Sequence, residues 1–302
     1  MSTFAAALPR AVSHSLQARG LDPLEVVALA RDALAEDLAL GPDVTTAATV
    51  PDGASSTGDV TCRTPGVLAG VDVAAAVLHV LADDTGTSLR VDVLHSDGDR
   101  LAPGDMVLTV TGATATLLTA ERTMLNLVGH LSGVATLTAR WVDAVAGTGA
   151  RIRDTRKTTP RLRALEKHAV RCGGGDNHRM ALGDAALVKD NHVAAAGGIA
   201  AALRAVRAYA PDVLVEVECD TLAEVREAAE AGAQLVLLDN MTPTQMRAAV
   251  AYARPLVIRL EASGGLRLDS ATEAAATGVD YLAVGALTHS APVLDLGFDL
   301  RA

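Results

Sequence analysis

The sequence predicts an α/β protein in which a small α+β domain is followed by a parallel β/α barrel. Half of the residues are hydrophobic but only 2% are aromatic, so Ala, Val and Leu must fill the core, which suits helices packed on strands. Short β runs separated by turn residues occupy roughly residues 56–111. Later in the chain, apolar runs that end in a polar residue recur at intervals of about 21 to 24 residues, the length of one strand, one helix and two short loops.

The N-terminal part begins with an amphipathic helix expected over residues 22–39, with Asp22 as its N-cap and Pro23 at its first position. Three β runs follow, and turn signals such as "SDGD" and "APGD" lie between them: "GDVTCRT", "LRVDVLH" and "MVLTVTG". An apolar helix is expected over 71–82, and a longer helical region over about 115–145. This mixture predicts the small α+β domain.

Six strand candidates make up the second part: "RIRDT" (151–155), "ALVKD" (186–190), "VLVEVE" ending at Glu218, "LVLLD" at Asp239, "LVIRLE" at Glu261 and "YLAVG" at Gly285. Near-continuous apolar strands that alternate with helices imply a parallel sheet covered by helices. Because no Gly-rich dinucleotide turn is present, a closed or nearly closed barrel is favoured over a Rossmann sheet. Chemistry is then expected at the carboxyl ends of the strands.

Charge and cysteine content narrow the function classes. A formal net charge of −10 argues against a general nucleic-acid binder, which needs a basic surface. The cysteines are odd in number and show no CxxC spacing, which indicates free thiols in a reducing cytoplasm: Cys62, Cys172 and Cys219. The N-terminal apolar patch is interrupted by Pro9 and Arg10, so we expect neither a signal peptide nor a membrane span.

Carboxylates at strand ends often serve only as the N-cap of the next helix. Here "TLAE" (221–224), "TPTQ" (242–245) and "SATE" (270–273) each fit a capping box, which leaves the strand-end acids Glu218, Asp239 and Glu261 for another role. Glu216 and Glu218 lie two residues apart, so both point to one face of their strand. If that face is the barrel interior, cations or ligand hydroxyls must satisfy them.

Cations concentrate in one stretch of this acidic protein. Residues 151–171 contain eight Lys or Arg and two acids, a local net charge of 8 − 2 = +6. A solvated basic helix explains Arg163, Lys167 and Arg171. It fits Arg156 and Lys157 less well, because they follow a strand and precede the proline expected to start the next helix. On a catalytic rim, Arg can hold a carboxylate bidentately and Lys can add a point charge.

The stretch "CGGGDNHRMALGDAALVKDNH" (172–192) allows a phosphate loop, a metal site or a helix stop. Cys172, His178 and His192 match no zinc spacing, and the Walker pattern is absent. "CGGG" after a helical run suits a helix C-cap. The glycines of "EASGG" (261–265) and "VGALTHS" (284–290) follow the last two strands, where β/α barrels commonly bind phosphate. The residues thus favour a phosphorylated sugar and a polyanionic partner as ligands.

Several segments together closely resemble the quinolinate phosphoribosyltransferase family, from about residue 25 to the C-terminus: "RDTRKTTPRLRALEKHAVRCGGGDNHRMALGDAALVKDNH", "VEVECD", "LLDN", "LEASGG" and "YLAVGALTHSAPVLDLGFDL". The resemblance implies an N-terminal α/β sandwich domain over 1–130, with the tail at about 290–302 packed on it. It implies an incomplete parallel β/α barrel of six or seven strands over 131–289. It also implies a homodimer with shared active sites, and allows a hexamer.

The activity implied by the resemblance is phosphoribosyl transfer from phosphoribosyl pyrophosphate to quinolinate with decarboxylation. The products are nicotinate mononucleotide, pyrophosphate and CO2, Mg²⁺ is required, and the reaction belongs to NAD biosynthesis. Three alternatives stay open. A related phosphoribosyltransferase would take nicotinate or another pyridine acid without decarboxylation. A sensor barrel would only bind a phosphorylated metabolite, and a lyase or isomerase would use Lys189 for a Schiff base.

The resemblance also assigns site residues. Arg156, His178, Arg179 and Lys189 would hold the dicarboxylate, and Arg122, which reads as a surface helix residue on the sequence alone, would come from the partner subunit. Lys157 and Lys189 would lie near the pyrophosphate or substrate. Glu218 and Asp239 would lie near the ribose hydroxyls and Mg²⁺, directly or through water or substrate. The 5′-phosphate would bind at Ser263, Gly264, Gly265, Gly285 and Ala286.

Within this set, the implied catalytic residues are Lys157, Lys189, Glu218 and Asp239. One position departs from the family pattern, because Arg161 stands where the family usually has a small residue. We interpret Arg161 as decoration of the first turn of the helix after Pro160.

Overall fold

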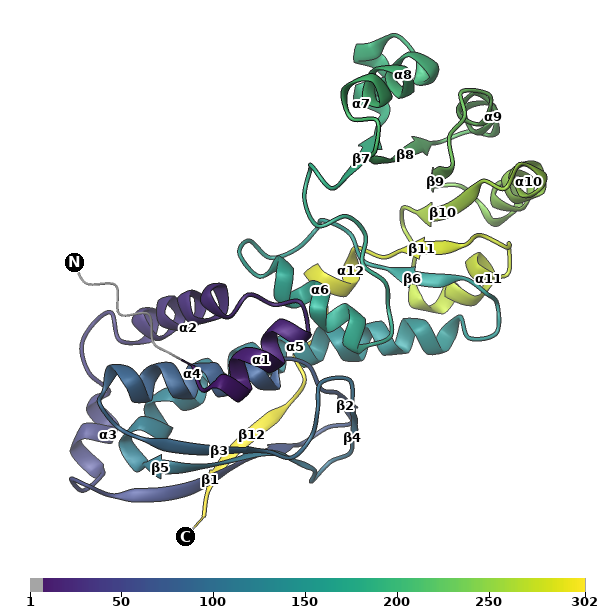
Figure 1. Ribbon diagram of the computed structural model, residues 1–302. Coiled ribbons are helices and arrows are strands. Elements are labelled where there is room, and N and C mark those ends of the chain that lie inside the picture. The colour runs from purple at the N-terminus through teal and green to yellow at the C-terminus, as the bar shows by residue number, and fades with distance from the viewer. Residues whose placement is uncertain (1–7, 302) are drawn as a thin grey trace. The chain divides into compact units, whose positions relative to one another are not determined.

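A computed structural model describes residues 8–301, so most of the N-terminal apolar patch lies outside the described residues (Figure 1). The chain divides into two compact units. The first contains the residues up to Leu137, Ala164–Gly173 and the residues from Ala291 on. The second contains Thr138–Arg163 and Gly174–Ser290. No helix in the described part of the chain is long and apolar enough to cross a bilayer.

The first unit is built on a four-stranded antiparallel sheet with the order β12-β1-β5-β3. Its strands are β1 (Ser55–Cys62), β3 (Leu89–Val93), β5 (Met106–Ala113) and β12 (Leu296–Leu300), and a small ribbon pairs β2 (Gly66–Val67) with β4 (Arg100–Leu101). Helices α1 (Arg10–Ala18), α2 (Pro23–Asp37) and α4 (Val71–Asp84) lie on one side of this sheet (Figure 1). Helix α3 (Val44–Thr49) precedes β1, and α5 (Thr114–Ala144) follows β5.

Local chemistry explains several of these elements. The Asp22 side chain accepts a hydrogen bond from the Leu24 backbone N–H at 2.8 Å and Pro23 opens α2, as the sequence predicts. A Cβ at Gly133 of α5 would come within 2.1 Å of the Pro292 carbonyl oxygen. Glycine therefore lets the C-terminal segment cross the helix closely and reach β1, beside which β12 pairs antiparallel.

The second unit contains a six-stranded parallel sheet with the order β6-β11-β10-β9-β8-β7. The strands are β6 (Arg151–Arg153), β7 (Ala185–Val188), β8 (Leu214–Cys219), β9 (Leu235–Asp239), β10 (Arg259–Ser263) and β11 (Tyr281–Ala283). The interior strands are almost wholly buried, which is why they read as apolar runs. The sheet curves, and the helices that follow β7, β8, β9 and β10 lie on its outer side (Figure 1).

The helices of this unit complete the β/α pattern: α7 (Asp190–Ala196), α8 (Ile199–Tyr209), α9 (Leu222–Glu230), α10 (Pro243–Ala253), α11 (Ala271–Ala275) and α12 (Ala286–His289). Two 3₁₀ turns are added, η1 (Arg254–Leu256) and η2 (Leu268–Ser270). The sheet does not close between β6 and β7. Instead, Asp176 forms an isolated parallel bridge with Arg153 beside β6. The predicted α/β class, with a sheet domain and an incomplete barrel, is confirmed.

Two of the three predicted capping boxes are present. The side chains of Thr221 and Thr242 each accept from the backbone N–H three residues later, and Glu224 and Gln245 reach back. The third prediction is wrong, because Ser270 makes no side-chain cap. Its hydroxyl donates to the Arg267 carbonyl within η2, so a local turn takes the hydroxyl that the capping box required.

The basic segment after β6 also differs from the prediction. Helix α6 (Arg163–Cys172) begins three residues after Pro160, so Arg161 does not decorate a helical turn. Arg161 instead has φ +69°, the left-handed conformation that glycine adopts more easily. The interpretation of Lys167 as a solvated helix residue is wrong, because Lys167 is fully buried. It lies within a stretch of α6, Leu165–Val170, in which every residue is buried. Arg171 is exposed, as predicted, and donates to the Arg19 carbonyl.

Candidate active site

The carboxyl ends of the six parallel strands meet at one edge of the sheet, and most predicted site residues follow these ends. The strand order places Gly285, which follows β11, next to the end of β10, where Ser263 is the last residue of the strand. Asp239 ends the neighbouring β9, Glu218 lies near the end of β8, and Lys189 follows β7. The topology therefore arranges the rim as glycine loops, then carboxylates, then a lysine.

Two guanidinium groups approach each other on this rim. Arg179 donates from Nη1 to the Ala185 carbonyl at 2.9 Å, and its pKa is lowered by partial burial and by the nearby charge of Arg156. The Nε atom of Arg156 is buried and has no hydrogen-bond partner among residues 8–301. A buried unpaired donor and two like charges are both unfavourable in the free protein. An anion with several oxygens would satisfy both features.

Carboxylates and their partners occupy the adjoining strand ends. Lys189 Nζ forms an ion pair and hydrogen bond with Glu218 Oε2. Asp239 Oδ2 accepts a hydrogen bond from Asn240 Nδ2 at 2.6 Å. Each carboxylate still has a second oxygen, so both can accept hydroxyl hydrogen bonds or coordinate a cation.

Asp239 is linked to the first glycine loop through Asn240. The Asn240 backbone N–H donates to the Ser263 carbonyl at 3.0 Å, and Asn240 has φ +54°. Gly264, with φ +82°, lies so close that a Cβ would come within 2.2 Å of Asn240 Oδ1. The loop after β10 therefore needs glycine at this position both for conformation and for space.

The second glycine loop is linked to Lys157. A Cβ at Gly285 would lie 3.0 Å from Lys157 Cδ, and Thr288 Oγ1 donates to the Lys157 carbonyl at 2.8 Å. His289 Nε2 lies 3.2 Å from the same Cβ position at Gly285, and its Nδ1 contacts Ser290 Oγ at 2.7 Å. Lys157 is exposed, so its ammonium group is available to a ligand at this loop.

Replacing Gly264 with alanine is expected to destabilise the loop and weaken binding of phosphoribosyl pyrophosphate. A left-handed alanine costs roughly 1–2 kcal/mol, and the contact with Asn240 adds displacement of that side chain. The free energy of unfolding and the KM for phosphoribosyl pyrophosphate measure the two effects. Gly265→Ala is the control, because Gly265 has φ +59° but nothing within 4 Å of its Cβ position. Equal losses in both variants would contradict the role of the Asn240 contact.

Below the rim, four charged or polar groups are buried together. His178 Nε2 lies 2.8 Å from Glu216 Oε2 and 3.5 Å from Glu261 Oε1, and Arg153 Nη1 pairs with Glu261 Oε2. His178 Nδ1 accepts a hydrogen bond from the Arg179 backbone N–H at 2.7 Å. Because Nδ1 is an acceptor, the proton of a neutral ring is on Nε2 and points to the carboxylates. The His178 ring therefore fixes the position of the Arg179 backbone.

Burial and the neighbouring Glu216 carboxylate raise the pKa of Glu261 to about 7, against the opposing charges of Arg153 and His178. Its Oε1 and the Oε1 of Glu216 are both buried, and neither accepts a hydrogen bond among the described residues. The carboxylates of Glu216 and Glu261 favour sharing one proton, because two buried neighbouring carboxylates repel each other when both are charged.

This pair predicts a pH dependence of stability. A folded-state pKa raised from about 4.5 to about 7 means that the folded state keeps a proton that the unfolded chain releases. The free energy of unfolding should therefore fall as pH rises from 4.5 to 7, by about 3 kcal/mol for this group. In Glu261→Gln this fall should disappear, and in Glu273→Gln, an exposed control, it should persist. Urea unfolding between pH 5 and pH 8 measures it; an unchanged slope in Glu261→Gln would contradict the assignment.

Three predicted residues need separate mention. His178 is 9% exposed and directs both ring nitrogens to protein groups, so its direct contact with substrate stays a prediction. Arg122 belongs to the first unit, on α5, where its side chain is 67% exposed and lies 3.8 Å from Glu121. Its role across a dimer also stays a prediction. Of the two glutamates predicted to share one face of their strand, Glu216 is buried and Glu218 is half-buried.

Sequence reasoning missed Arg153, Asn240 and His289 as site residues. Arg153 lies in the strand candidate "RIRDT", which forms the edge strand β6, and an arginine within a strand of a predicted barrel signals a buried acidic partner, here Glu261. Asn240 was quoted in "LLDN", and asparagine after a strand end is a signal for a left-handed turn. Nothing in the spacing distinguished His289 from a surface histidine.

A β/α-barrel enzyme is the class that this fold and this rim define. A family model described as "Quinolinate phosphoribosyl transferase, C-terminal domain" matches residues 134–299, and the corresponding N-terminal model matches residues 43–132. The chain belongs to the quinolinate phosphoribosyltransferase family, as the motifs predicted.

Similar proteins come from distant organisms. A Mycobacterium leprae protein named nicotinate-nucleotide pyrophosphorylase (carboxylating) is 56% identical over 272 residues, 89% of this chain and 95% of that protein. A human protein of the same name is 39% identical over 287 residues, 93% of this chain and 94% of that protein. The solved structure of the Francisella tularensis nicotinate-nucleotide pyrophosphorylase has a TM-score of 0.86 and 34% identity, with 100% of both chains covered.

Proposed function

We propose that this protein transfers the phosphoribosyl group of phosphoribosyl pyrophosphate to quinolinate and decarboxylates the product. Pyrophosphate, CO2 and nicotinate mononucleotide leave, and the reaction serves NAD biosynthesis. The carrying observation is the pair Arg156 and Arg179, in which the charge of Arg156 lowers the pKa of Arg179 and the buried Nε of Arg156 has no hydrogen-bond partner among residues 8–301. This pair suits an anion with more than one carboxylate, and the names of the similar proteins agree with it.

Different residues on the rim would bind different parts of the two substrates. The backbone at Ser263, Gly264, Gly265, Gly285 and Ala286 would hold the 5′-phosphate, and Lys157 would reach the pyrophosphate. Glu218 and Asp239 would hold the ribose hydroxyls and stabilise the positive charge that develops at the anomeric carbon. Lys189, paired with Glu218, would orient that carboxylate and neutralise the substrate acid.

Bond changes then follow without a protein nucleophile. The ring nitrogen of quinolinate attacks the anomeric carbon, and the bond to pyrophosphate breaks. When the adjacent carboxylate leaves as CO2, the bonding electron pair stays on the ring carbon, where the neighbouring positive nitrogen stabilises it, and a proton from solvent then binds to that carbon. Buried His178 would keep Arg179 in place during these steps, because its Nδ1 accepts the Arg179 backbone N–H.

Mg²⁺ fits the donor set at the ends of β8 and β9. Glu218 and Asp239 each keep an oxygen free of the Lys189 and Asn240 contacts, and Mg²⁺ is commonly held by one or two carboxylates plus substrate phosphates and water. When bound, Mg²⁺ would neutralise the leaving pyrophosphate.

The alternative is transfer to nicotinate or another pyridine acid without decarboxylation. The number of cations favours quinolinate, because Arg156, Arg179 and Lys189 exceed what one carboxylate needs. Incubating the protein with phosphoribosyl pyrophosphate, Mg²⁺ and either acid distinguishes them, with pyrophosphate and CO2 both measured. We expect one CO2 per pyrophosphate with quinolinate. Turnover of nicotinate but not of quinolinate would overturn the proposal.

We further infer a homodimer in which Arg122 of one subunit completes the site of the other. Arg122 supports this inference because it is an exposed cation of the first unit, whereas the rim residues belong to the second unit. Dimers can assemble into a hexamer by the same closed symmetry. The three cysteines are free thiols, as predicted, which agrees with a cytoplasmic enzyme.

A further inference from the structure

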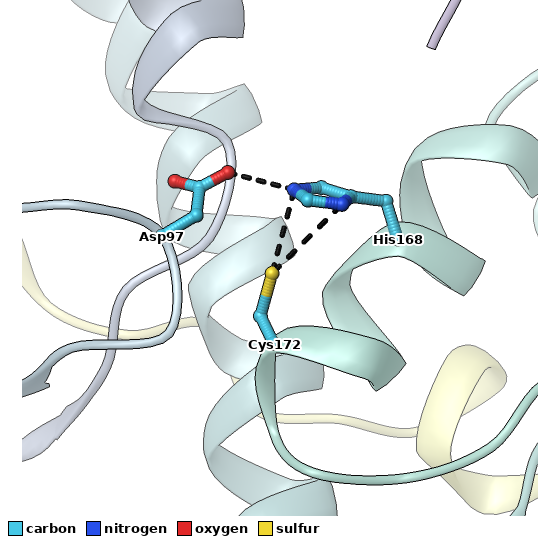
Figure 2. A group of neighbouring side chains, drawn as sticks. All are labelled: Asp97, His168 and Cys172. Carbon is cyan, nitrogen blue, oxygen red and sulfur yellow. Dashed lines mark hydrogen bonds and ion pairs between the residues drawn. The ribbon is translucent and has the colours of Figure 1, made fainter. Parts of the chain in front are cut away.

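A second cluster of chemically active side chains lies entirely within the first unit. Asp97 comes from the loop between β3 and β4, and His168 and Cys172 come from α6, four residues apart (Figure 2). Residues four apart on a helix share one face, so the helix presents the imidazole and the thiol together. The ligand atoms of all three lie within 4.8 Å of one another. The proposed function leaves all three unused.

The three groups converge on one nitrogen. Asp97 Oδ2 lies 2.7 Å from His168 Nε2, and Cys172 Sγ lies 3.4 Å from the same Nε2 and 3.9 Å from Nδ1 (Figure 2). A nucleophilic Cys–His–Asp arrangement would place the acid and the thiol on opposite ring nitrogens. One proton on Nε2 can point to only one of its two neighbours. Three lone-pair donors around one point instead suit a single cation.

The surroundings hold Asp97 in place for this role. Its Oδ1 accepts the Val71 backbone N–H at 2.9 Å, which directs Oδ2 towards His168. Arg19 lies 4.0 Å from Asp97 but only 2.9 Å from Asp72, whose charge balances the guanidinium. A divalent cation with the Asp97 carboxylate and a Cys172 thiolate would then have zero net charge. Electroneutrality matters here, because Asp97 and His168 side chains are 1% and 5% exposed.

We propose that Asp97, His168 and Cys172 form a zinc site in the first unit. One thiolate, one imidazole nitrogen and one carboxylate are ligands that Zn²⁺ accepts in tetrahedral geometry, whereas Mg²⁺ prefers oxygen alone. Cys172 is half-buried, which leaves room for water in the fourth position. The Sγ–Nε2 distance already suits two ligands of one zinc ion. Binding would require the Asp97 and His168 atoms to separate by about half an ångström as zinc replaces the shared proton.

The site would tie the β3–β4 loop to the C-terminal end of α6. This role is structural and separate from the phosphoribosyl transfer. The spacing of Cys172, His178 and His192 does not indicate this zinc site. Its histidine, His168, lies before Cys172 on the same helix, and Asp97 lies 71 residues before His168 in the chain.

Cobalt(II) added to the reduced, chelator-treated full-length protein tests the proposal. Thiolate ligation gives a near-ultraviolet charge-transfer band, which carboxylate sites such as Glu218 and Asp239 cannot produce. We expect this band at one equivalent of cobalt, and its loss on adding zinc. Cys172→Ala should abolish it, and His168→Gln should weaken binding by more than the roughly 10–100-fold that removal of a supporting partner costs.

Cys219→Ala is the matched control, since Cys219 is also a free thiol whose pKa burial raises to about 12, as it does for Cys172. The control should keep the band, and zinc should raise its Tm as in the unmodified protein. Zinc should leave the Tm of Cys172→Ala unchanged, with circular dichroism confirming its fold. Absence of the band in the unmodified protein, or its survival in Cys172→Ala, would overturn the site.

Discussion

Replacing Arg156 with alanine is expected to lower kcat/KM for quinolinate by about 100-fold or more without loss of stability. A guanidinium hydrogen-bonded to a substrate carboxylate contributes about 2–5 kcal/mol that the variant would lose. In the free protein the same side chain has a buried Nε that finds no hydrogen-bond partner in the described part of the chain, and it lies near the like charge of Arg179. Its removal should therefore leave the free energy of unfolding unchanged or slightly higher.

Steady-state kinetics measure the loss of kcat/KM, and urea unfolding of the same preparations measures the free energy of unfolding. Arg151→Ala is the control, because Arg151 begins β6, at the opposite end of that strand from the loop that contains Arg156, and pairs with Asp176 at 2.5 Å. We expect Arg151→Ala to change kcat/KM less than twofold. Near-normal turnover of Arg156→Ala would remove Arg156 from the site, and a large loss of stability would show that its role is structural.

The strand pattern of the second unit could be read from the sequence because each interior strand is buried on both faces. Such strands must be apolar throughout, and the polar residue at the end marks the rim. The predicted ends at Glu218, Asp239 and Glu261 all fall within strands β8, β9 and β10. Local periodicity is sufficient there, because the same physical requirement acts on every residue of the strand.

The depth of a charged side chain could not be read in this way. Lys167 and Glu166 look like a solvated helix surface in sequence, yet both are fully buried in α6. Glu261 ends an apolar run like Asp239, but it faces Glu216 and Arg153 inside the sheet rather than the rim. Burial of charge is decided by partners far away in the chain, and no local pattern encodes those partners.

The direction of His178 illustrates the same limit within the site itself. The resemblance assigns His178 to the substrate, and its neighbour Arg179 does lie near Arg156 on the rim. The imidazole nevertheless turns inward to Glu216, because two buried carboxylates require a donor more strongly than a solvated rim does. The structure therefore places the His178 ring among buried carboxylates and the Arg179 side chain near Arg156, and the contact of either residue with substrate stays a prediction.

The proposed sharing of the active site across a dimer predicts the second large effect, which concerns mixtures of two inactive variants. Arg122→Ala and Arg156→Ala should each abolish most activity, because each removes a cation from every site of its homodimer. If Arg122 acts across the dimer, a mixed dimer contains one site with both changes and one site with neither. The intact site should turn over quinolinate at the normal rate.

Random pairing of equal amounts gives half mixed dimers with one working site each, so about a quarter of the unmodified activity should return. Arg156→Ala mixed with Arg179→Ala is the control, since both side chains belong to the same unit and every site of that mixed dimer stays damaged. Differently tagged subunits, purified through both tags, isolate the mixed dimers. Recovery in the first pair alone locates Arg122 in the partner's site, whereas equal failure of both purified mixtures would place Arg122 in its own subunit's site.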